Sequence, residues 1–273
     1  MHIWVRRSIT GFIFIAIMFC GLLGGRLAFL ALFALVNALC FREFLLIVLD
    51  KNIPGYRTRF GIAMLLGVAP FAISAAVFYG GLELWLSLTL ILPLLFLFFV
   101  FELFNASPQP INNIAHVALG ILYVSIPFAL LNWIAFGDHN FQTGIIIGLL
   151  LLTWMNDSAA FVFGSLLGRK PLFPRVSPKK TWEGAVGGLV FAAGFAFALQ
   201  LWFPMLTLAN WIILALIVTV FGTLGDLIES LLKRSYQLKD SGALLPGHGG
   251  MLDRFDGFIF MLPFATAYLA WIK

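Results

Sequence analysis

Long apolar stretches, separated by short polar breaks, run along nearly the whole chain. Nine of them approach 20 residues, the length that an α-helix needs to cross a bilayer. They are residues 8–24, 27–48, 60–80, 83–103, 112–136, 142–168, 183–203, 208–228 and 255–272. This pattern predicts an all-α polytopic integral membrane protein with about nine transmembrane helices.

No internal repeat or low-complexity linker interrupts this pattern. We therefore expect a single membrane domain over residues 1–273. Within it, residues 1–136 form the N-terminal transmembrane helices. Residues 142–273 form the C-terminal helices and the cytoplasmic loops that carry the active site.

Composition and charge agree with a membrane protein. The chain is 62% hydrophobic and 11% charged, whereas a soluble domain is about half apolar and a quarter charged. Both cysteines, Cys20 and Cys40, lie in apolar runs, so they predict neither a disulfide framework nor a metal site. The net charge of +5 gives no indication of nucleic-acid binding.

The positions of the basic residues predict the orientation. If the N-terminus is cytoplasmic and nine helices follow, all but Arg26, Arg42 and Lys273 of the 17 Lys and Arg residues fall in cytoplasmic segments. Cytoplasmic loops of membrane proteins carry such an excess of positive charge. The sequence thus predicts a cytoplasmic N-terminus and a non-cytoplasmic C-terminus.

Polar chemistry collects in Lys239–Gly257, which reads KDSGALLPGHGGMLDRFDG. Its glycines permit tight turns and close approach to a ligand. Asp253 and Asp256 are three residues apart at the entry to the last apolar stretch, where a helix would place them on one face. A pair of carboxylates suits Mg²⁺, which keeps several waters for phosphate groups. The cations beside them are Lys233, Arg234, Lys239 and Arg254, and the whole set describes a site for a metal-bound polyphosphate.

His248 lies among these glycines, with no cysteine and no second histidine nearby. Zinc ligation is therefore disfavoured, and a role in polyphosphate contact or loop structure is favoured over one in acid–base chemistry.

Two acidic residues lie outside that segment. Asp157 precedes Arg169 by 12 residues, or roughly 18 Å of helix, which places a carboxylate deep in the apolar layer. Such a residue is read as functional by default, and the alternative is a structural hydrogen bond through Asn156. Asp226 ends another apolar run and either joins the metal site or belongs to a solvated helix end with ordinary charge pairs.

The basic loop SPKKTWEG has two equally weighted interpretations. Ser177, Lys179 and Lys180 could contact phosphate groups on the same membrane face as the candidate site. The other interpretation is an anchor against anionic lipid head groups.

The run SLLKRSYQLKDSGALLPGHGGMLDRFD resembles the signature of the phosphatidate cytidylyltransferases, also called CDP-diacylglycerol synthases. The matching residues are Ser230, Lys233, Arg234, Lys239, Asp240, Pro246, Gly247, His248, Gly249, Gly250, Asp253, Arg254 and Asp256. GDLIES and SPKKTWEG also resemble family segments. One departure is NDSAAF, where many members have Asp-Thr-Gly-Ala-Tyr, although Asp157 itself is retained.

The resemblance implies transfer of the cytidylyl group of CTP to phosphatidate, which yields CDP-diacylglycerol and pyrophosphate. It implies Mg²⁺, with Mn²⁺ as a substitute and room for a second cation. The metal ligands would be Asp226, Asp253 and Asp256. The nucleotide phosphates would be held by Lys239, Arg234 and Arg254, with Lys233 and His248 as further substrate contacts. Ser177, Lys179 and Lys180 would hold the phosphatidate head group or share the triphosphate, and Asp157 would line the lipid entry.

The expected partners are CTP, phosphatidate and membrane lipids, without nucleic acid, and a homodimer stays open. The expected location is a bacterial inner membrane with the active site on the cytoplasmic side. The alternatives are a cytidylyltransferase for another anionic lipid, such as an archaeal ether lipid, an ion-coupled transporter, or a lipid-binding scaffold. A transporter would usually show broken helices or repeat halves near the midplane.

Overall fold

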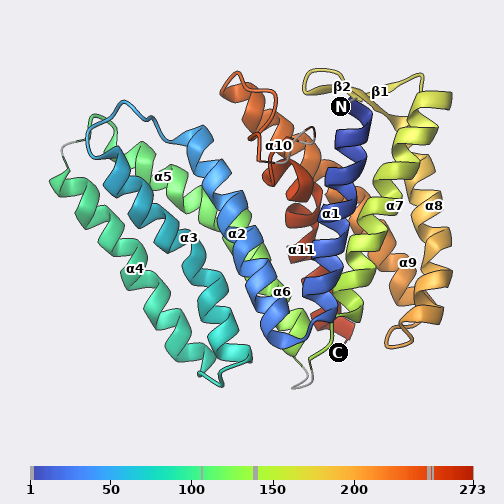
Figure 1. The fold of residues 1–273 in the computed structure, drawn as a ribbon, viewed down its shortest axis with the longest axis horizontal. Coiled ribbons are helices and arrows are strands. Elements are labelled where there is room, and N and C mark those ends of the chain that lie inside the picture. Colours follow the sequence, from blue (N-terminus) through green and yellow to red (C-terminus); the bar gives the residue numbers. More distant parts are fainter. Residues whose placement is uncertain (1–2, 106, 138–140, 245–246, 248, 273) are drawn as a thin grey trace. The chain divides into compact units, whose positions relative to one another are not determined.

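The structure is a computed structural model that describes residues 3–105, 107–137, 141–244, 247 and 249–272 (Figure 1). The described chain consists of helices and one short hairpin. It divides into two compact units. The first comprises Met1–Phe141 with Asp240–Arg254, and the second comprises Gln142–Lys239 with Phe255–Lys273.

The first unit is built around a central helix, α2. Its helices are α1 (Ile3–Leu23), α2 (Arg26–Val48), α3 (Tyr56–Phe78), α4 (Leu84–Phe104), α5 (Pro110–Gly120) and α6 (Ile126–Phe136), with a π-helical segment, η1 (Ile121–Ser125), between the last two. Phe29, Phe33 and Phe41 on α2 are fully buried. A Cβ atom at Gly67 on α3 would lie 2.1 Å from the Phe41 ring, so a glycine is required where α3 meets α2.

A charged pair lies in the interior of the first unit. Arg59 on α3 pairs with Glu102 on α4, and the two residues are 1% and 2% exposed. Arg59 Nη2 also donates to Glu102 Oε2 at 3.2 Å, so the contact is bidentate. Asn113 on α5 donates to the same oxygen at 3.2 Å. The carboxylate therefore joins three helices.

The second unit is a helical bundle with a hairpin at one end (Figure 1). Its elements are α7 (Gly144–Leu167), β1 (Pro171–Phe173), β2 (Ser177–Thr181), α8 (Trp182–Trp202), α9 (Leu208–Ile217), η2 (Val218–Gly222, π-helical), α10 (Thr223–Ser235) and α11 (Leu252–Ile272), of which the residues from Phe255 onward belong to this unit. Gly184 and Gly187 on α8 face α7 so closely that added Cβ atoms would lie 2.7 Å from the Ala160 oxygen and 2.5 Å from Phe163. Small residues thus bring the two helices together, as is usual in membranes.

Seven helices in the described part of the chain are long and apolar enough to cross a membrane. They are Arg26–Val48, Tyr56–Phe78, Pro110–Phe136, Gly144–Leu167, Trp182–Trp202, Leu208–Ser235 and Leu252–Ile272. Their bounds agree with the predicted spans to within a few residues, except that the eighth continues to Ser235. The prediction of an all-α membrane protein is confirmed. The described parts of α1 and α4 give shorter apolar stretches, so the number nine and the orientation of the termini stay predictions.

Candidate functional site

The basic loop of the second unit folds as the β1–β2 hairpin, which the sequence did not predict. Pro171 pairs with Thr181 and Phe173 with Ser177. Thr181 caps α8 by accepting a hydrogen bond from the Gly184 amide at 3.2 Å, a favoured role for threonine. The Glu183 carboxylate accepts from the Arg169 and Lys170 amides, at 3.1 and 3.2 Å. The two ends of the loop are therefore fixed to the start of α8.

This hairpin brings one lysine to a predicted metal ligand. Lys180 on β2 pairs with Asp226 on α10, and both side chains are partly exposed, at 31% and 24%. Ser177 is half-buried, whereas Lys179 is exposed. The two adjacent lysines, for which the sequence predicted the same role, therefore differ in their environment. Lys180 has an acidic partner, and Lys179 faces outward.

Asp226 lies where α10 crosses α11. Asp256 on α11 is half-buried beside the Asp226 and Glu229 carboxylates, and its Oδ1 accepts from the Gly257 amide at 2.8 Å. A Cβ atom at Gly225 would lie 2.7 Å from the Asp256 carbonyl oxygen. Glycines therefore allow α10 and α11 to cross closely, and at this crossing the Asp226 and Asp256 carboxylates lie side by side.

We expect Gly257→Ala to destabilise the second unit by about 1–3 kcal/mol, the usual cost of overpacking. The new Cβ atom would lie 2.7 Å from Asp226 Oδ1 and 3.0 Å from the Gly222 carbonyl oxygen. Gly194→Ala on α8 is the matched control, because nothing lies within 4 Å of its Cβ position. It should be neutral or stabilising by up to about 1 kcal/mol. Thermal unfolding in detergent measures both, and equal effects would refute the close crossing.

Farther along α10, Glu229 pairs with Lys233 one helical turn later. Glu229 is fully buried and Lys233 is 9% exposed. The alternative interpretation expected ordinary charge pairs at this helix end, and this pair is present, but it is buried and not solvated. The helix continues to Ser235, so both residues lie within it. Lys233, predicted to contact substrate, has an acidic partner within the protein.

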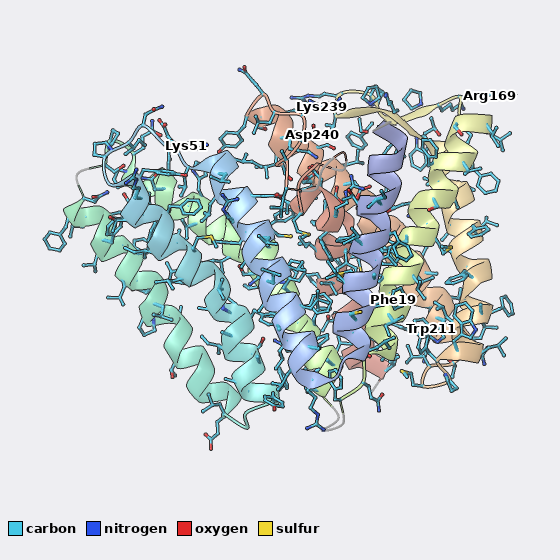
Figure 2. The ribbon with its side chains drawn as sticks, viewed as in Figure 1. Phe19, Lys51, Arg169, Trp211, Lys239 and Asp240 are labelled. Atoms are coloured by element: carbon cyan, nitrogen blue, oxygen red, sulfur yellow. The ribbon has the colours of Figure 1, made fainter. Side chains whose placement is uncertain are left out.

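Two further predicted cations are exposed at the end of α10. Arg234 Nη1 donates to the Leu238 carbonyl oxygen at 3.0 Å, and Lys239 is exposed. Figure 2 shows Lys239 and Arg169 at one end of the second unit and Trp211 toward the other. The cations of this unit therefore gather at the end that also carries the hairpin.

Asn156 and Asp157 on α7 have different environments. Asn156 is 2% exposed, and its Oδ1 accepts from Thr219 Oγ1 in η2 at 3.0 Å. Its Nδ2 donates to Asp157 Oδ1 at 3.4 Å, whereas Asp157 is exposed. The structural hydrogen bond between helices thus belongs to Asn156. The predicted role of Asp157 at the lipid entry stays a prediction.

In the first unit, the described residues of the glycine-rich segment 240–254 (240–244, 247 and 249–254) make several hydrogen bonds to Asp253. The Asp253 carboxylate accepts from the Gly250 amide at 2.7 Å and from the Ser241 amide at 3.0 Å. Gly249 has φ +82°, a conformation that glycine adopts without strain. Arg254 is exposed. His248, predicted to contact substrate, lies outside the described residues.

Glu43 on α2 was not predicted from the sequence as part of the site. Its Oε2 accepts hydrogen bonds from the Leu252 amide at 2.8 Å and from Ser241 Oγ at 3.1 Å. Glu43 is 3% exposed. A carboxylate inside the predicted span 27–48 was the available signal, because acidic residues within apolar spans are rare and functional by default.

No group of three or more His, Cys, Asp and Glu side chains within the described residues is arranged to hold a metal ion. The Asp226 and Asp256 carboxylates form a pair. Mg²⁺ is commonly bound through one or two carboxylates plus waters and substrate phosphates. The pair therefore fits a Mg²⁺ ion that a phosphorylated ligand helps to hold.

A family model described as the cytidylyltransferase family matches residues 5–272. A phosphatidate cytidylyltransferase of Bacillus subtilis (strain 168) is 41% identical over 163 residues, which are 58% of this chain and 59% of that protein. One of Staphylococcus saprophyticus is 38% identical over 162 residues, 59% of this chain and 58% of the relative. One of Staphylococcus aureus (strain COL) is 45% identical over 126 residues, 45% and 48% of the two chains. The chain spans about half to three fifths of the length of these curated relatives.

Proposed function

Because the chain belongs to the cytidylyltransferase family, we propose that it transfers the cytidylyl group of CTP to phosphatidate. The products are CDP-diacylglycerol and pyrophosphate. One observation carries the proposal beyond family membership. Lys180, Asp226 and Asp256 come from three segments that resemble the family, and they meet in the second unit.

The reaction demands charge neutralisation more than acid–base chemistry. A phosphate oxygen of phosphatidate, already ionised at neutral pH, attacks the α-phosphorus of CTP. The new P–O bond forms as the bond to the pyrophosphate leaving group breaks. Both reactants are anions, so the protein must position them and balance their charge. The cations at the hairpin end of the second unit suit this task.

Each residue has a proposed role. Lys180 is partly exposed, so it can donate to a phosphate oxygen while it stays near Asp226. Ser177 and Lys179 assist it at the head group or the triphosphate. Lys239, Arg234 and Arg254 hold the nucleotide phosphates. Lys233 pairs with the Glu229 carboxylate, so its proposed contribution to substrate binding is indirect.

Asp226 and Asp256 are the proposed Mg²⁺ ligands, with Mn²⁺ as a substitute. When bound, the ion would supply positive charge that neutralises phosphate oxygens. Asp226 also holds Lys180 at the edge of the site. Asp253 stays a proposed ligand from the sequence, although its carboxylate also organises segment 240–254.

The function is tested by incubating the detergent-purified protein with CTP and defined phosphatidate. We expect pyrophosphate and CDP-diacylglycerol in equal amounts, with neither formed when phosphatidate is omitted. A panel that includes an ether-linked archaeal-type phosphatidic lipid tests the lipid class. If the protein prefers the ether-linked lipid, that lipid and not phosphatidate is its substrate. If no lipid yields product, the proposed activity is refuted.

The hairpin lysines give a matched pair for mutation. We expect Lys180→Ala to raise the KM for one substrate at least about tenfold, because loss of a charged hydrogen bond costs about 1.5–3 kcal/mol. Lys179→Ala should change it less, because Lys179 is exposed. Steady-state kinetics with each substrate varied in turn measures the effect. If both variants keep near-wild-type kinetics, the hairpin lysines do not contact substrate, and the interpretation of the hairpin as a membrane anchor is favoured.

The setting of the enzyme is also proposed. The seven apolar helices make it an integral membrane protein. We propose a bacterial inner membrane with the site on the cytoplasmic side, since the basic residues favour that side and the similar phosphatidate cytidylyltransferases are bacterial. Membrane lipids and a homodimeric partner are part of this proposal.

A further inference from the structure

Glu43 lies where an apolar helix would be expected to carry an apolar residue. It is 3% exposed within α2, and its neighbours Phe41 and Phe44 are buried as well. A carboxylate in such surroundings is costly unless hydrogen bonds replace its lost water. Those bonds come from the Leu252 amide and the Ser241 hydroxyl, both in segment 240–254.

The segment is closely fitted to this carboxylate. A Cβ atom at Gly242 would lie 2.6 Å from Glu43 Oε1, and one at Gly250 would lie 2.4 Å from Oε2. Neither glycine therefore has space for a side chain. The same Ser241 and Gly250 donate their amides to Asp253, so the bonds of Glu43 and those of Asp253 hold one backbone conformation.

We propose that Glu43 is a positioning residue that holds the described parts of segment 240–254, residues 240–244 and 249–254, in the conformation that presents Asp253 and Arg254. Glu43 bonds to the start of α11 and to Ser241, which fixes both ends of the segment on α2. It acts by accepting hydrogen bonds and not by its charge. The kinetic consequence rests on the proposed function, whereas the effect on the segment does not.

The experiment compares Glu43→Ala with Glu43→Gln, which keeps an acceptor oxygen of nearly the same reach. Ser241→Ala, which removes one of the two bonds, is a milder third variant. The matched control is Asn37→Leu, on the same helix. Asn37 is fully buried and donates to the Gly67 oxygen of α3 at 3.3 Å, so its loss loosens α2 without touching the segment.

Two measurements are made on each detergent-purified full-length variant. The first is amide hydrogen exchange of peptides that cover residues 240–254. The second is kcat/KM for CTP at limiting Mg²⁺. For Glu43→Ala we expect exchange at least about tenfold faster and kcat/KM at least about tenfold lower, because the Leu252 amide and the Ser241 hydroxyl would be left buried without an acceptor. Ser241→Ala should change both in the same direction but less, and Glu43→Gln should stay within about threefold, since a neutral acceptor retains most of a typical bond.

Three results would overturn the inference. In the first, exchange of the segment is unchanged in Glu43→Ala and Ser241→Ala. In the second, Asn37→Leu changes the segment as much as Glu43→Ala does, which means general loosening. In the third, Glu43→Gln is as damaging as Glu43→Ala, which means that the charge acts directly. A wild-type protein that makes no CDP-diacylglycerol would refute the proposed function alone, because the exchange measurement still decides the role of Glu43.

Discussion

Replacing Asp226 or Asp256 by asparagine should lower cytidylyl transfer by at least about a hundredfold, because each change removes a proposed ligand of the Mg²⁺ ion that would neutralise the developing phosphate charge. Asparagine keeps the size of the side chain, so the crossing of α10 and α11 should persist. Both residues are only half-buried, which argues for a small effect on folding. Steady-state transfer over a Mg²⁺ titration, with unfolding temperature recorded beside it, measures both quantities.

The control is Asp50→Asn, the same chemical change at an exposed carboxylate that accepts from the Asn52 amide at 2.9 Å. It should leave the rate unchanged. The double variant of Asp226 and Asp256 should lose far less than the product of the two single losses, because residues that act as a unit are non-additive. Near-wild-type rates of both single variants at limiting Mg²⁺ would refute the proposed metal ligands.

The largest expected effect on stability is that of Glu102→Ala, which should lower the free energy of unfolding by about 3–5 kcal/mol, the usual cost of leaving one charge of a buried pair alone. Arg59 would then lie at 1% exposure without its carboxylate partner. Asn113 would lose an acceptor as well. Thermal unfolding in detergent is the measurement.

The matched control removes both charges at once. Arg59→Met combined with Glu102→Leu replaces the pair by apolar side chains of similar volume, a change that is often neutral or stabilising. We expect this double variant to recover most of the stability lost in Glu102→Ala. A double variant as unstable as the single one would mean that the pair itself, and not the uncompensated charge, determines the stability of this region.

The sequence predicted the helices well because their length and composition follow directly from the thickness of a bilayer. It did not predict the β1–β2 hairpin. The strands have three and five residues and contain two prolines, Pro171 and Pro178, which strand signals disfavour. The π-helical segments η1 and η2 were missed for a different reason. They continue the apolar pattern of the helices around them, so no change in composition marks them.

For the candidate site, the sequence identified residue types but not their partners. It named Lys180 and Asp226, which are 46 residues apart, yet nothing in the spacing says that they pair. It could not show that Glu229 is buried, because burial depends on how α10 packs. The partners of Glu43 could not be predicted because they come about 200 residues later in the chain. Local periodicity gives no information over such separations.

The hydrogen bond between Glu43 and Leu252 can form only late in the synthesis of the chain. The two residues are 209 positions apart, and the intervening chain contains α7 to α10 of the other unit. At about 5–20 residues per second, the ribosome needs on the order of 10–40 s to make this length. During that time α2 is already made, while the donors that satisfy its carboxylate do not yet exist. The first unit therefore begins before the second and is completed only when α7 to α10 of the second have been made. For most of the time that the chain is being synthesised, Glu43 has to exist without the two bonds that later satisfy it.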